Sequence, residues 1–115
     1  MVIISDTIKY IQIVTTFENK ADADALVSKI LAERLVACAH ISEISSRYNF
    51  EGKYCEHAEW ELKMITKRSF IKKCATFIKA NHLYKVPQII AIPIAFASKE
   101  YAAWIDESLS KGGKL

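Results

Sequence analysis

Glycine is scarce in this chain, and its positions exclude the common glycine-rich phosphate loops. Gly52 stands alone in the middle of the 115 residues, and Gly112 and Gly113 lie near the C-terminal end. A P-loop or a dinucleotide fingerprint needs several glycines at fixed spacing. The G-x-S-x-G nucleophile elbow of serine hydrolases is also absent. We therefore expect a protein that is not an enzyme.

Cysteine is also sparse and has no short-range pairing. Cys38, Cys55 and Cys74 are an odd number, and no C-x-x-C pair occurs. The apolar residues 1–4 have no basic leader before them and no small-residue cleavage site after them, so we expect no signal peptide. These features favour a reducing compartment over a disulfide scaffold. The sequence predicts a cytoplasmic protein.

Long hydrophobic runs and a strong charge bias are both missing. The apolar segment 89–97 is too short to cross a bilayer and contains Pro93, so we expect no membrane partner. The net charge is only +3 and the basic residues are scattered, so we expect no nucleic acid partner. The length predicts a single domain over residues 1–115, with an ordered core at 8–110 and a flexible tail at 111–115.

The periodicity of apolar residues predicts an α+β fold. Segments of alternating or β-branched residues indicate strands, and apolar residues at helical spacing indicate helices. Asn19 is placed as an N-cap three residues before Asp22, and Ser98 as the cap of the last helix. The expected order is a strand over residues 10–16, a helix over 19–34, strands over 35–49 and 54–66, a helix over 68–81, a strand over 86–93 and a terminal helix. The two prolines of the last strand belong at its ends or on a sheet edge.

The central hairpin is the most unusual predicted element. Its turn is centred on Gly52, because glycine accepts a positive φ without a Cβ clash. The flanking arms are too long for so small a sheet to cover, so the hairpin must project beyond its own core. An overhang of this kind is stable when a partner chain buries it. The sequence therefore indicates an oligomer.

The chain contains five short motifs that together form a recognisable pattern. They read T-T-F at 15–17, E-R-L-V-A-C at 33–38, Y-N-F-E-G-K at 48–53, H-L-Y-K-V-P at 82–87 and Y-A-A-W at 101–104. In this order they resemble the CutA divalent-cation tolerance family. The resemblance implies a ferredoxin-like β-α-β-β-α-β sandwich with a long central hairpin and a C-terminal helix, assembled as a PII-like homotrimer. It also implies a role in tolerance of divalent cations, copper especially.

Several positions depart from the family pattern as the resemblance gives it. Thr15 and Phe77 stand where some members have the cysteines proposed as copper ligands. Lys85 and Gln88 replace carboxylates that follow the histidine of the fourth motif. These changes make that neighbourhood more cationic. They favour weak metal binding, or a ligand other than a metal.

Two residues are candidate metal ligands. His82 has an imidazole that suits divalent copper, and it is equally well explained as a residue that ends the preceding helix. A Cys38 thiolate would suit Cu(I), although free cysteine is often a small buried hydrophobe. Cys74, on the apolar stripe of its helix, is predicted to pack in the core. We expect no certain cofactor, with copper or another divalent cation as the candidate.

A polar pocket between subunits is the other candidate site. Glu59 matches an acidic family position, and with Tyr48, Lys53 and Tyr84 it is predicted to line this pocket. The same residues are equally compatible with an interface hydrogen-bond network. His57 and His40 are read as ordinary strand or surface residues. Three functions stay open: a metal-responsive trimer, a PII-like small-molecule sensor, and a structural trimer that binds a partner protein without a ligand of its own.

Overall fold

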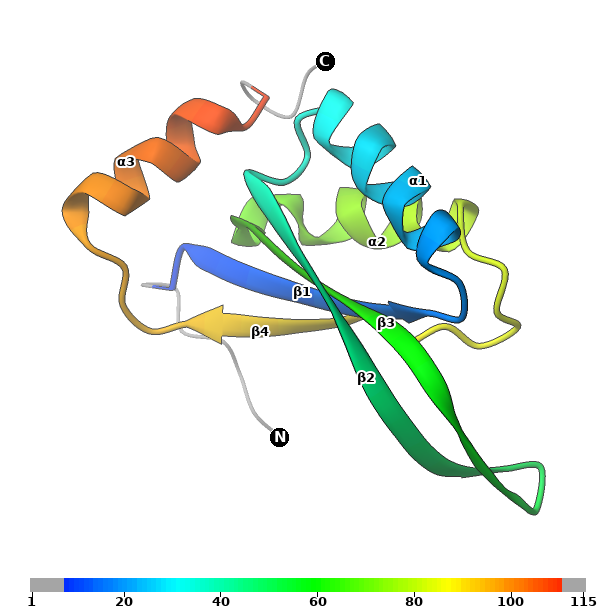
Figure 1. Ribbon diagram of the computed structural model, residues 1–115. Coiled ribbons are helices and arrows are strands. Elements are labelled where there is room, and N and C mark those ends of the chain that lie inside the picture. Colours follow the sequence, from blue (N-terminus) through cyan, green and yellow to red (C-terminus); the bar gives the residue numbers. More distant parts are fainter. Residues whose placement is uncertain (1–7, 111–115) are drawn as a thin grey trace.

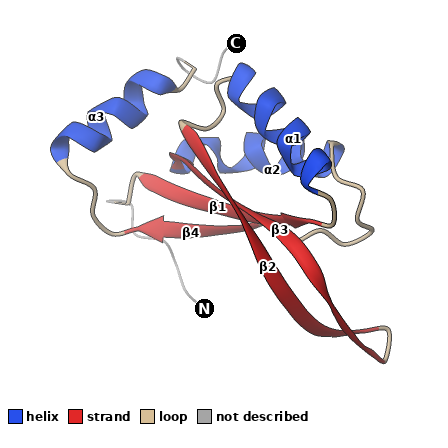
Figure 2. Ribbon diagram, viewed as in Figure 1, coloured by secondary structure: helices blue, strands red, loops and turns tan. Residues whose placement is uncertain are grey.

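The polypeptide forms one antiparallel sheet of four strands, in the order β2-β3-β1-β4 (Figures 1 and 2). The computed structural model describes residues 8–110, so the predicted tail at 111–115 lies outside the described residues. This topology confirms the predicted α+β sandwich. The elements are β1 (Tyr10–Phe17), α1 (Lys20–Ala32), β2 (Cys38–Phe50), β3 (Lys53–Lys67), a 3-10 turn (Arg68–Phe70), α2 (Ile71–Ala80), β4 (Ile90–Ile94) and α3 (Lys99–Ser108).

The core lies between one face of the sheet and the helices α1 and α2. Alternate residues of β1, among them Ile11 and Ile13, point to this face and are almost fully buried. Helix α1 adds Leu26 and Ile30, which lie one turn apart on its inner stripe. Both helices lie on the same side of the sheet (Figure 1), and no helix among residues 8–110 is long and apolar enough to cross a membrane.

Two strand boundaries differ from the prediction by more than one residue, each for a local reason. The strand expected from residue 35 begins at Cys38, because Arg34 adopts a left-handed φ of 55 after α1 and delays the strand. The Arg34 guanidinium donates hydrogen bonds to the carbonyls of Glu107 and Ser108 in α3. The strand expected over residues 86–93 is shorter in the structure, where β4 begins only at Ile90. Pro87 lies in the segment that precedes β4. Pro93 does lie in an edge strand, as predicted.

The hairpin of β2 and β3 runs well beyond the rest of the sheet (Figure 1). These strands pair continuously from Cys38 opposite Ile65 to Phe50 opposite Lys53. Strand β1 ends its pairing where Phe17 faces Trp60, so the part of β3 before Trp60 has no β1 neighbour. The tip is a two-residue turn in which Glu51 has φ 52 and Gly52 has φ 78. Two consecutive positive φ values are typical of the type I′ turn that suits a twisted hairpin.

We predict that Gly52→Val destabilises the protein by on the order of 1 kcal/mol through backbone strain. A Cβ at this position meets nothing within 4 Å, so crowding does not contribute. Gly52→Asn is the matched control, because asparagine tolerates the left-handed region better than valine. Urea unfolding at fixed protein concentration measures both variants. A Gly52→Val protein as stable as the wild type would contradict the turn assignment.

Candidate functional site

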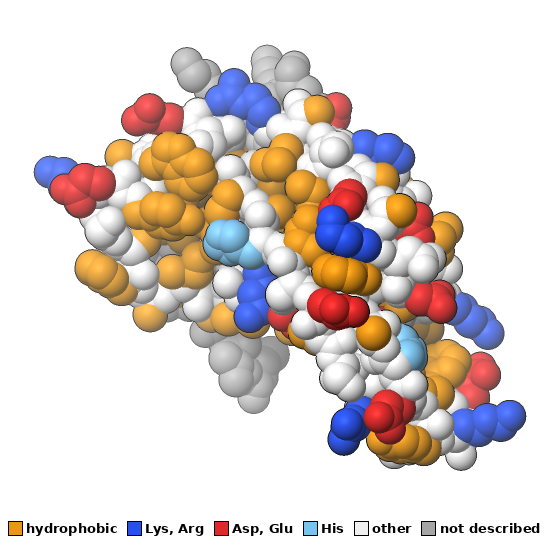
Figure 3. All heavy atoms as spheres, in the orientation of Figure 1, with side chains coloured by type: hydrophobic (Ala, Val, Ile, Leu, Met, Phe, Trp, Pro, Cys, Tyr) orange, Lys and Arg blue, Asp and Glu red, His pale blue; other side chains and the backbone are white. Residues whose placement is uncertain are grey.

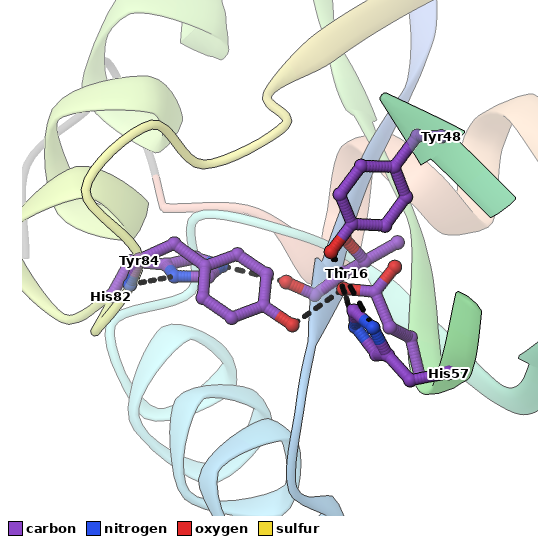
Figure 4. Close-up of polar contacts among 6 residues, drawn as sticks. Thr16, Tyr48, His57, His82 and Tyr84 are labelled. Carbon is purple, nitrogen blue, oxygen red and sulfur yellow. Dashed lines mark hydrogen bonds and ion pairs between the residues drawn. The ribbon is translucent and has the colours of Figure 1, made fainter. Parts of the chain in front are cut away.

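A cluster of polar side chains lies where the hairpin leaves the sheet (Figure 4). Glu59 of β3 is only 6% exposed, and its Oε2 accepts a hydrogen bond of 2.5 Å from the Tyr84 hydroxyl. His57 Nε2 lies 3.8 Å from the same oxygen, and the Tyr48 hydroxyl lies 3.4 Å from the His57 ring nitrogens. The alternation of β3 puts His57 and Glu59 on one face. The cluster therefore joins both arms of the hairpin to the loop that follows α2.

Both tyrosines of the cluster keep their protons at neutral pH. Burial raises the pKa of Tyr84, and the hydrogen bond to Glu59 and the negative charges of Glu59 and Glu18 raise it further. The pKa of Tyr48 is raised by desolvation, by the neighbouring Cys55 and, to a smaller extent, by the same two carboxylates. The Tyr84 hydroxyl is consequently a donor to Glu59.

A cavity of about 380 Å³ opens beside this cluster. That volume lies in the range of small-molecule sites. Tyr48, Glu59 and Tyr84 line it, so three of the four residues predicted for a pocket between subunits lie together within one chain. Lys53 lies instead at the start of β3, opposite Phe50, and is not part of the lining. The remaining lining residues are Thr16, Phe50, Lys85, Val86 and Gln88.

Both ring nitrogens of His82 are engaged in hydrogen bonds within the chain. Nε2 lies 2.7 Å from the carbonyl oxygen of Thr16, and because a carbonyl only accepts, Nε2 carries the proton. Nδ1 then accepts from the backbone N–H of Tyr84 at 3.1 Å. The ring also stacks on Phe17, with 4.1 Å between ring centroids. His82 therefore fastens the loop that carries Tyr84 to the end of β1, and a metal bond would have to replace one of these hydrogen bonds.

The structure does not bring Cys38 and His82 together. Cys38 pairs with Ile65 near the other end of the sheet, half-buried, with its Sγ 3.7 Å from the Tyr101 hydroxyl of α3. Cys74 is fully buried, as predicted for a core residue, and burial raises the pKa of its thiol to about 12. Within the part of the chain that the structure describes, no three His, Cys, Asp or Glu side chains are grouped to hold a metal ion.

Sequence reasoning missed part of the cluster. His57 was read as an ordinary strand or surface residue, yet it contacts Tyr48 and Glu59. The period-two alternation of β3 predicts this contact, because residues 57 and 59 must lie on the same face of the strand. Thr16 was missed for a different reason, because its backbone carbonyl, which any residue supplies, binds His82.

The fold and the pocket define a small ferredoxin-like α+β protein with a projecting hairpin. The family model described as CutA1 divalent ion tolerance protein matches residues 11–108, and the chain belongs to this family. It is 36% identical over 105 residues to protein CutA 1, chloroplastic, of Oryza sativa, covering 90% of this chain and 59% of that protein. It therefore spans about three-fifths of the length of this plant relative.

Two further relatives span nearly the same length as this chain. The divalent-cation tolerance protein CutA of Escherichia coli is 33% identical over 100 residues, covering 84% of this chain and 88% of that protein. The crystal structure of CutA1 from Pyrococcus horikoshii superposes with a TM-score of 0.85 at 33% identity, covering 88% of this chain and 99% of that one. The likeness thus includes the hairpin and both layers of the fold.

We predict that acid weakens the folded state through His82. Burial lowers the pKa of His82, and this effect outweighs the opposing influences of the Thr16 carbonyl, Glu59 and Asp22. The unfolded chain then takes up a proton near pH 6.5, at a higher pH than the folded one. Stability is therefore complete above about pH 6.5 and falls as the pH drops through the lower folded pKa.

Urea unfolding at pH 7.5 and pH 5.0 checks this prediction. His82→Gln is expected to be less stable than the wild type at pH 7.5 and to lose less stability on acidification. His40→Gln, at an exposed position of β2, is the matched control and should behave as the wild type. An equal acid response in the wild type and His82→Gln would show that another group titrates.

Proposed function

We propose that the protein takes part in tolerance of divalent cations, with copper foremost among them, and that it has no catalytic activity. The observation that carries this proposal is the family match over residues 11–108. The name of the Escherichia coli relative attributes that role to it. The free cysteines favour a cytoplasmic location, although relatives are named as chloroplastic and periplasmic.

The proposed acting form is a homotrimer. The projecting hairpin exposes aromatic side chains, with Tyr48 39%, Phe50 43% and Tyr54 64% exposed. The edge strand β4 exposes Ile90 and Ile92 at 46% and 43%. Hydrophobic side chains also gather at the α3 end of the molecule and near the hairpin tip (Figure 3). An unpaired strand edge and an exposed apolar overhang both favour burial against further copies of the chain.

Light scattering at micromolar concentration tests the assembly. We expect three times the 13.0 kDa chain mass. Tyr54→Ser, which removes an exposed ring from the hairpin, should shift the population toward smaller species. Lys72→Ser, at an exposed position of α2, is the control and should keep the mass of the wild type. A stable folded monomer at that concentration would refute the proposed trimer.

Metal binding in this proposal is weak and involves His82. The hydrogen bonds of both ring nitrogens support this expectation, because coordination must replace one of them. Tight protein sites for copper or zinc use three or more ligands. In residues 8–110 such a group is not found within one chain. A stronger site would need ligands from several subunits.

Calorimetric titration with Cu(II) at pH 7.5 and pH 5.5 measures this affinity. We expect a Kd no tighter than about 1 micromolar, which corresponds to about 8 kcal/mol. Binding should weaken at pH 5.5, because protons compete for the imidazole nitrogen. His82→Ala should reduce binding, and Cys38→Ala is the comparison for the second candidate ligand. Nanomolar binding that persists in His82→Ala would show that His82 is not the ligand.

A second candidate function is a small-molecule sensor, and the cavity lined by Tyr48, Glu59 and Tyr84 specifically favours it. A structural trimer without a ligand is the remaining alternative. Metal analysis of untagged protein from its native cells discriminates these functions. Stoichiometric copper or zinc supports the first, and metal-free protein favours the other two.

A further inference from the structure

Glu59 is a buried carboxylate without a close cationic partner in the described chain. Its Oε2 accepts from Tyr84, a neutral donor, and the nearest basic group is His57 at 3.8 Å, a residue that carries charge only when protonated. The ammonium of Lys85 lies at the rim of the cavity, 4.0 Å from Glu51 on the hairpin turn. A buried charge without a partner is unfavourable. The cavity therefore offers a compensating position to a cation.

The two tyrosine hydroxyls of the cavity both lie in the cluster around Glu59. Tyr84 donates to Glu59 Oε2, and Tyr48 contacts His57, whose Nε2 lies 3.8 Å from the same oxygen. The two tyrosines come from different elements, Tyr48 from the hairpin and Tyr84 from the loop after α2 (Figure 4). Glu59 is the buried charge among the lining residues, whereas the Lys85 side chain is 82% exposed, so a positively charged ligand is favoured at this position over an anion.

The rest of the lining suits an organic body rather than a bare metal ion. Three aromatic rings, those of Tyr48, Phe50 and Tyr84, surround the cavity, and Val86 adds an apolar wall. Aromatic faces attract organic cations through their quadrupoles. A volume of about 380 Å³ also exceeds the needs of a single metal ion. Carbon-bearing cations therefore match both the charge and the surface of this site.

We propose that the cavity lined by Tyr48, Phe50, Glu59 and Tyr84 binds a small organic ammonium ion, a protonated alkylamine whose nitrogen pairs with Glu59 and whose carbon chain lies against the aromatic rings. This inference rests on the second candidate function, small-molecule binding. It does not depend on copper, and in the proposed homotrimer the hairpin residues that line the cavity also face further copies of the chain. Glu59 and Lys85 then have opposite effects, because Glu59 attracts the ammonium and Lys85 repels it.

Three probes of nearly equal size test the proposal on the full chain. n-Butylamine, n-butanol and butyrate are titrated at pH 7.0, and Kd values are taken from amide chemical shifts in NMR spectra. n-Butylamine is expected to bind at least about tenfold more tightly than either of the others. Light scattering of each sample keeps a change of assembly separate from a change of affinity.

Three variants then assign the charge that recognises the amine. Glu59→Gln keeps the shape of the side chain and should weaken n-butylamine binding by about tenfold or more. Lys85→Gln should strengthen that binding. Glu61→Gln is the matched control, since Glu61 lies two residues along β3 and pairs with Lys63 at 3.6 Å, and it should leave the affinity unchanged. Tyr48→Leu, which removes an exposed ring, provides a second loss-of-binding variant if Glu59→Gln does not fold.

The outcomes separate this inference from the function on which it rests. Equal binding of n-butylamine and n-butanol, or an affinity that Glu59→Gln does not change, overturns the ammonium site and leaves small-molecule binding intact. Preferred binding of butyrate, abolished by Lys85→Gln, would show an anion site and also overturn it. Failure of all three probes to bind overturns both the ammonium site and the sensor function for this class of small ligand.

Discussion

The length mismatch between the central hairpin and its sheet is the constraint on which this structure depends. Strands β2 and β3 contain 13 and 15 residues, whereas β1 contains 8 and β4 contains 5. The hairpin must then extend past the layer that α1 and α2 cover, and its aromatic residues remain exposed. The same mismatch creates the cavity, because Tyr48 and Glu59 lie in the part of the hairpin that β1 does not reach.

His82 links this overhang to the core. Its ring joins the carbonyl of Thr16 to the backbone of Tyr84, and the Tyr84 side chain in turn reaches Glu59. Loop, strand end and hairpin are thus connected by hydrogen bonds in series. The neutral ring of His82 stabilises the fold through both hydrogen bonds. A metal bound to either ring nitrogen replaces one of these bonds, so the two uses of the ring compete. The proposed metal binding and the architecture of the pocket therefore involve the same residue, His82.

The elements of the fold were predictable from local sequence, and much of the site was not. Alternation in β1, helical spacing in α1 and the glycine at the turn act over a few residues, so their physical signals are contiguous. Tyr48, Glu59 and Tyr84 were placed in one pocket through the family resemblance. Lys53 was placed there as well, although within one chain it lies at the turn. The start of β2 was misjudged because Arg34 has a left-handed backbone and contacts the distant C-terminal end of α3.

By itself the sequence determined the α+β class, the projecting hairpin with Gly52 at its tip, and the membership of the family that the comparison then established. Only the tertiary structure decided which His82 nitrogen carries a proton and that His57 belongs to the cluster around Glu59. The physical reason is separation along the chain. The bond between His82 and Thr16 joins residues 66 positions apart, and its acceptor is a backbone carbonyl that every residue type provides. Sequence periodicity reports which face a side chain occupies, and only the packed structure reports which distant group it meets there.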